Sequence, residues 1–156
     1  MLTDARLELF EAAKWLAQNG TEKVIIKSLI PDDVSKNLAS GFYSRNDLGH
    51  RYGTHWLRCE DGYTGTRVYR LIMKIYGSEF LQRKMGLVEF RTISEAYFMQ
   101  FPEDAMSTNR IHYLIQSLLT GDAIVNEKCR TCSKPYVTHR DDCLKRDCPI
   151  CEMLES

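Results

Sequence analysis

The sequence lacks any run of apolar residues that approaches the roughly 20 needed to cross a membrane. Its first residues, MLTDARLELFEAAKW, also lack the basic region and following apolar run of a secretion signal. We therefore expect a cytoplasmic protein that does not associate with membranes. In that reducing compartment cysteines are more often metal ligands or buried thiols than disulfides. We expect the same of the six cysteines of this chain.

Signatures of disorder and of the common enzyme classes are missing as well. The chain has no repeat or low-complexity tract, and 44% hydrophobic against 27% charged residues is typical of a globular protein. It contains no His-Glu-x-x-His, phosphate-binding Walker loop or Gly-x-Ser-x-Gly motif. A zinc deaminase carries a proline before its Cys-x2-Cys pair, whereas Pro149 lies inside the second pair here. We expect a binding protein without a small-molecule substrate, not an enzyme.

The strongest motif consists of two cysteine pairs near the end of the chain, Cys129-x2-Cys132 and Cys148-x2-Cys151. This spacing is typical of two tight turns that hold one tetrahedral zinc ion. A site closed by four thiolates leaves no open position for water, so the predicted Zn²⁺ is structural. His139 and Cys143 are competing ligands.

Iron is a second candidate for these ligands. A rubredoxin-like iron centre usually has glycine after the second cysteine of each pair, where Ser133 and Glu152 stand here. The symmetric pairs therefore favour a four-cysteine zinc knuckle in a tail module of residues 123–156.

Apolar residues at helical spacing predict a mainly α protein, with a helical domain over residues 1–122. A first helix covers about 4–19 and stops at Gly20. Residues 23–30 form a second helix, although Val24-Ile25-Ile26 also fits a strand. Pro31 fits the start of a third helix that ends at Gly41, and these two short helices resemble a helix-turn-helix.

Three longer helices and one short strand complete the prediction. Val68 to Ile75 marks a helix that ends at Gly77, Phe90 to Phe101 marks one that Pro102 terminates, and Ser107 or Thr108 begins one that stops at Gly121. Residues 79–85 form a short segment between the first two. In the tail, residues 135–138 fit a strand that returns the chain across the metal.

The formal net charge is zero, but the charge is unevenly distributed. Residues 36–91 carry ten Lys and Arg against five Asp and Glu, whereas 92–127 carry one against five. Lys128 to Arg146 carries six against two. This polarity suits a protein that holds an anionic polymer on one side and a protein partner on another, although ordinary solvated faces produce it too.

Candidate DNA contacts lie in three basic places. The first is the predicted 32–40 helix, although Asp32 and Asp33 at its start would repel phosphates. The second is a loop over residues 41–66, where arginines alternate with aromatic residues such as Trp56, which could equally anchor the loop in the core. The third is the knuckle, whose cations could instead offset thiolate charge. The candidates are Lys36, Asn37, Arg45, Arg51, Arg58, Lys134 and Arg140.

Residues 54–104, residues 108–139 and the closing Cys-Pro-Ile-Cys together resemble the FlhC family, the zinc-containing subunit of the bacterial flagellar master activator. The landmarks are Thr54-x-Trp56, Asn109-Arg110 and Thr138-His139 after the first cysteine pair. The similarity covers roughly residues 22–151. It implies a helical bacterial protein that binds double-stranded promoter DNA with a smaller FlhD-like partner and recruits RNA polymerase. It also implies that the four paired cysteines hold zinc and that Cys143 and His139 do not.

Two features depart from this family. The chain stops soon after the last ligand, and residues 41–53 lack the proline-rich character of the flagellar subunit. Both departures fit a relative carried by a conjugative plasmid or integrative element. A zinc-stabilised adaptor that binds only protein is the alternative function. The roles of Cys59, Cys143 and His139 stay open at this point.

Overall fold

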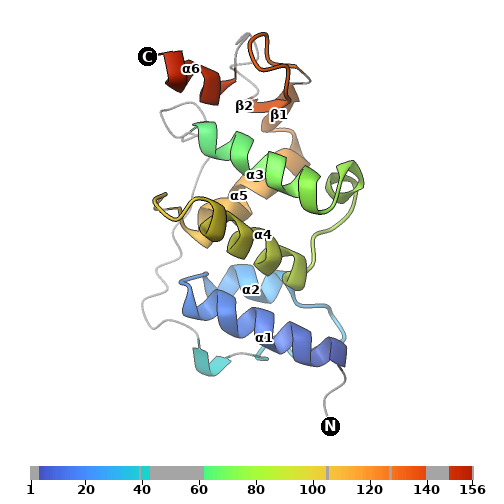
Figure 1. Ribbon diagram of the computed structural model, residues 1–156. Coiled ribbons are helices and arrows are strands. Elements are labelled where there is room, and N and C mark those ends of the chain that lie inside the picture. The colour runs from blue at the N-terminus through green and yellow to red at the C-terminus, as the bar shows by residue number, and fades with distance from the viewer. Residues whose placement is uncertain are drawn as a thin grey trace. The chain divides into compact units, whose positions relative to one another are not determined.

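The computed structural model describes residues 4–38, 40–42, 62–104, 106–126, 128–139 and 148–155. The protein is mainly helical, with a small two-stranded sheet and four clustered cysteines near its C-terminus (Figure 1). The elements in chain order are α1 (Asp4–Gln18), α2 (Lys23–Leu29), the 3-10 helix η1 (Ser40–Phe42), α3 (Gly62–Ile75), the 3-10 helix η3 (Ser78–Gln82), α4 (Leu87–Gln100), α5 (Thr108–Thr120), β1 (Ala123–Asn126), β2 (Tyr136–His139) and α6 (Pro149–Glu155).

The chain divides into two compact units. The first comprises Met1–Tyr52 and Lys84–His112, and the second comprises Gly53–Arg83 and Tyr113–Ser156. The sequence predicted a domain boundary at residue 122. In the structure α3 and β2 lie on opposite sides of that boundary but belong to the same unit. Independent folding of residues 123–156 stays a prediction.

In the first unit, α1 packs along α4 and against α2. Its buried positions are the small or apolar Ala12, Ala13, Leu16 and Ala17, which repeat at helical spacing and let the neighbouring backbones approach closely. The rings of Trp15 and Phe98 lie 6.1 Å apart at the edge of this contact. The predicted first helix is confirmed, and Gly20 ends it with a φ of +86° that glycine adopts without steric cost.

A buried polar network joins the corner after α1 to the start of α5 within the first unit. The Asn109 amide oxygen accepts a hydrogen bond from the Glu22 N–H at 2.8 Å, and its nitrogen donates to the Gly20 carbonyl at 3.1 Å. The hydroxyls of Thr21 and Thr108 lie 2.6 Å apart. Because Glu22 and Asn109 are buried, the Asn109 side chain replaces water as the partner of the Glu22 N–H.

We expect Asn109→Ala to lower the free energy of unfolding by about 1–3 kcal/mol, because it leaves the buried Glu22 N–H without an acceptor. Asn19→Ala is the matched control, since Asn19 also bonds a backbone carbonyl, that of Trp15, but at an exposed position. Urea denaturation of both variants measures the difference. Equal losses in the two variants would show that the buried network contributes nothing specific.

The predicted helix from Pro31 to Gly41 is wrong, because residues 31–38 form successive turns. The N–H groups of Val34 and Leu38 bond the carbonyls three residues earlier, Pro31 and Ser35. The Ser35 hydroxyl accepts from the Asn37 N–H at 3.2 Å, a local bond that competes with helix formation. A helix-turn-helix is therefore not confirmed in the described part of this segment.

In the second unit, α3 carries the small sheet and α6. Strands β1 and β2 are antiparallel, with Ala123 opposite His139 and Asn126 opposite Tyr136. Every residue of β2 is buried. The strand at β2 and the helices at α2, α4 and α5 are confirmed, whereas β1 and α6 were not predicted. Helix α3 begins at Gly62, so residues 62–66 do not belong to the predicted loop 41–66.

Among the described residues, no helix combines the length and the apolar character that a membrane crossing requires.

Candidate metal centre

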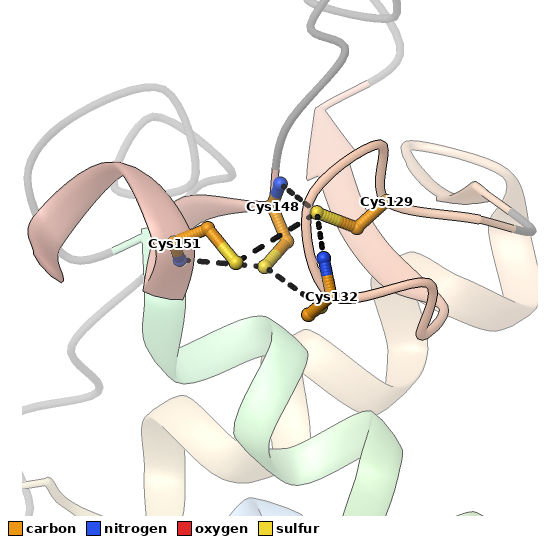
Figure 2. Close-up of side chains that lie close together, drawn as sticks. All are labelled: Cys129, Cys132, Cys148 and Cys151. Atoms are coloured by element: carbon orange, nitrogen blue, oxygen red, sulfur yellow. Dashed lines mark hydrogen bonds between the residues drawn. The ribbon is translucent and has the colours of Figure 1, made fainter. Parts of the chain in front are cut away.

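The four paired cysteines converge on one point of the second unit (Figure 2). Cys129 and Cys132 lie in the connection between β1 and β2, Cys148 directly precedes α6, and Cys151 lies on α6. Cys129, Cys148 and Cys151 are buried together with Tyr136, and Cys132 and Ile150 pack against this cluster half-buried. The sulfurs are thus held in a small core of their own.

The distances between the sulfurs fit a tetrahedral metal site. Cys129 Sγ lies 3.8 Å from Cys151 Sγ, Cys132 Sγ lies 3.8 Å from Cys148 Sγ, and all four lie within 4.8 Å of one another. Zn–S bonds of about 2.3 Å in a tetrahedron place sulfurs about 3.8 Å apart. A disulfide would require about 2.05 Å, and all four cysteines are free thiols. The cluster is therefore able to hold one four-coordinate metal ion.

The backbone around the first pair folds into a tight turn. The Cys129 N–H donates to the Lys134 carbonyl and the Ser133 N–H donates to the Cys129 carbonyl, both at 2.9 Å. Ser133 takes a φ of +61°, the left-handed conformation that glycine normally supplies. The absence of glycine after Cys132 therefore does not prevent this turn, and it does not discriminate between zinc and iron.

Backbone N–H groups point at the sulfurs from both pairs. Cys129 Sγ accepts from Cys148 N–H at 3.2 Å and from Thr131 N–H at 3.4 Å, and Cys148 Sγ accepts from Cys151 N–H at 3.4 Å. Donors of this kind stabilise thiolates, which are the form that binds a metal.

The protonation of the cluster follows from these contacts. Burial by itself raises the pKa of the Cys129 thiol, but hydrogen bonds from the backbone of Cys132, Cys148 and Thr131 outweigh it and lower the pKa to about 6. The pKa of Cys151 is raised, first by its hydrogen bond with Cys148 and then by burial. Because adjacent thiolates repel one another, the cluster ionises fully only when a cation replaces the protons.

Helix α3 holds the chain between the first cysteine pair and β2. The Thr66 hydroxyl accepts from the Val137 N–H at 3.1 Å, and Arg70, one turn later, donates from Nε to the Pro135 carbonyl at 3.1 Å. A second guanidinium nitrogen, Nη2, lies 3.8 Å from Cys132 Sγ. Neither Thr66 nor Arg70 was predicted to belong to the site. Their i, i+4 spacing would have placed them on one helix face only if α3 had been predicted to begin at Gly62.

The predicted DNA contacts are only partly described. Lys36, in the first unit, is half-buried: it donates to the Ile30 carbonyl and lies 3.6 Å from Asp32. Asn37 in the first unit and Lys134 in the second are exposed. Arg45, Arg51, Arg58 and Arg140 lie outside the described residues, as do Cys59 and Cys143. His139 is buried at the end of β2 and is not a member of the four-sulfur cluster.

Comparisons with models of known protein families, with curated proteins and with solved structures gave no match to this chain.

Proposed function

We propose that this chain is the DNA-binding subunit of a hetero-oligomeric transcriptional activator, of the FlhC type, stabilised by one structural Zn²⁺. The observation that carries the proposal is the closed cluster of four sulfurs, two of which lie on the basic connection between β1 and β2. Zinc suits a compact site of four thiolates, and such a site leaves no position for a reactive water. The role of the metal is then to hold the fold of the tail, not to catalyse a reaction.

Exposed cations around the first cysteine pair support contact with DNA. Lys128, Arg130 and Lys134 are all exposed, and residues 128–139 contain no acidic residue. Metal binding would hold these side chains on a rigid turn, which reduces the entropy lost when they meet phosphates. Arg51 and Arg58 of the predicted loop would add phosphate contacts.

The FlhD-like partner, the polymerase contact and the bacterial setting rest on the sequence resemblance alone. Co-expression with a small neighbouring gene, followed by mass measurement of the purified complex, tests the partner. Run-off transcription from a promoter fragment, with and without that partner, tests activation.

In the double variant Arg51→Gln, Arg58→Gln we expect weaker binding to duplex DNA and a smaller dependence of affinity on salt. Each phosphate contact removed should reduce the slope of log K against log salt by about 1. Fluorescence anisotropy with a labelled random duplex measures this, because phosphate contacts do not depend on base sequence. Lys84→Gln is the control, since Lys84 is an exposed cation outside the proposed contacts.

An unchanged affinity and slope in the double variant would remove the loop from the proposed interface. If the zinc-loaded chain binds no duplex DNA either alone or with its partner, the adaptor function replaces the activator function.

A further inference from the structure

We infer that Arg70 of α3 is a positioning residue of the metal centre, which holds the Cys132 thiolate and the knuckle backbone with one guanidinium group. The inference rests on the metal centre proposed above and assigns it a support outside its four ligands. Arg70 reaches two different acceptors, the Pro135 carbonyl through Nε and Cys132 Sγ through Nη2. Its planar fork of N–H donors makes both bonds in one conformation, which a lysine ammonium on a flexible stem does less well.

The negative charge of the metal centre explains why a cation beside Cys132 is favourable. Four thiolates around a divalent ion carry a net charge of −2, and burying that charge is costly unless donors or cations surround it. Cys129 Sγ accepts bonds from the backbone N–H groups of Cys148 and Thr131. Cys132 Sγ is contacted by a charged side chain from a different element. Arg70 thereby offsets part of the excess negative charge.

Cys132 is also the ligand whose sulfur most needs protection from reagents in solution. Cys132 is half-buried, whereas the other three cysteines of the described cluster are buried. An electrophile or a chelator from solution therefore reaches Cys132 first. A charge-assisted hydrogen bond draws electron density from the sulfur and lowers its nucleophilicity, so Arg70 should slow attack at the exposed ligand.

The contact between Arg70 and the knuckle forms only when the second unit is folded, because Arg70 lies on helix α3. Thr66 and Arg70 lie one helical turn apart and bond the stretch from Pro135 to Val137, which directly follows the first cysteine pair. The position of Arg70 is thus set by the docking of β2 on α3. Conversely, the guanidinium fixes where the knuckle lies relative to that helix within the second unit.

The test measures the rate of alkylation of each cysteine by iodoacetamide in the zinc-loaded full-length protein. A protease that cleaves only after arginine leaves Cys129 in residues 111–130 and Cys132 in residues 131–140, so mass spectrometry follows them separately. Fragment spectra separate Cys148 from Cys151 within residues 147–156. In Arg70→Met we expect Cys132 to react about tenfold faster, the factor for the loss of about 1.4 kcal/mol. Rates at Cys129 and Cys148 should stay within about twofold. Arg70→Lys, which keeps the charge, should restore part of the protection.

Lys74→Met is the matched control. It removes a positive charge from the same helix at an exposed position one turn after Arg70. An unchanged Cys132 rate in Arg70→Met, or an equal rise in Lys74→Met, would overturn the inference. A uniform rise at all four cysteines would overturn it too, because it would indicate that the whole tail has opened.

Zinc content separates this result from the proposed function. If the wild-type protein binds no zinc, the metal centre itself fails. If it binds one zinc per chain and the Arg70 variants react as the wild type does, only the role of Arg70 fails.

Discussion

In the Cys148→Ser protein we expect the bound zinc to fall from one ion per chain to substoichiometric amounts, and β2 and α6 to lose protection against amide hydrogen exchange. Structural zinc sites contribute apparent binding energies on the order of 10 kcal/mol, most of which depends on a complete ligand set. Cys148 also joins the two pairs, because its N–H donates to Cys129 Sγ. Metal analysis and hydrogen-exchange mass spectrometry measure the two effects.

Cys143→Ser is the control for this variant, because Cys143 stands between the two pairs in sequence but outside the proposed ligand set. It should keep one zinc per chain and the protection of β2. If Cys148→Ser retains a tightly bound zinc while Cys143→Ser loses it, the ligand assignment is wrong. DNA binding of the two variants then tests separately whether an ordered knuckle is needed for the proposed function.

A second large effect is expected from the buried His112, as a loss of stability when the pH falls. Burial lowers the pKa of His112 to about 4 in the folded protein, against about 6.5 when it is unfolded. Its ring lies edge-on to Phe90, with centroids 5.6 Å apart, in the apolar core of the first unit. A charged imidazole is therefore disfavoured there.

The sign of the effect follows from proton uptake. Above pH 6.5 neither state binds the proton, so His112 does not change stability with pH. Between pH 6.5 and 4 the unfolded chain is protonated first, and stability falls by about 3 kcal/mol in total. Below pH 4 both states are protonated and this contribution no longer changes.

Urea denaturation from pH 7.5 to 4 measures the effect as the difference between the wild type and His112→Gln. The difference is needed because thiolates also release metal in acid, in both proteins alike. The wild type should lose about 3 kcal/mol more than the variant over this range. Parallel pH profiles for the two proteins would show that His112 titrates normally in the folded state.

The strongly periodic helices could be predicted because their apolar pattern and their ends are set by residues that are close together in the sequence. Helices α1, α4 and α5 each carry an apolar stripe at helical spacing, and Gly20, Gly77 and Gly121 end segments with positive φ values, as expected of glycine stops. The helix predicted after α2 was wrong because another local interaction competes with helix formation there. Pro31 and two aspartates resemble a helix start, but Ser35 bonds the Asn37 N–H and the chain forms separate turns.

The short elements of the tail were harder to predict, since four-residue strands and a seven-residue helix are too short to show a period. Strand β1 exists because it pairs with β2, and α6 follows directly on a cysteine of the cluster. The start of α3 was also missed, because GYTGT carries two glycines and reads as loop. Packing against β2 and α6 overrides that weak local preference.

From the sequence, the two Cys-x2-Cys pairs predicted the four sulfurs that the structure brings together, because such a pair is a local turn whose geometry needs few other residues. Only the tertiary structure decided what surrounds them. Thr66 and Arg70 lie 71 and 65 residues before the backbone groups they bond. No periodic pattern encodes such contacts, because they form only when α3 and β2 bury their apolar sides against each other.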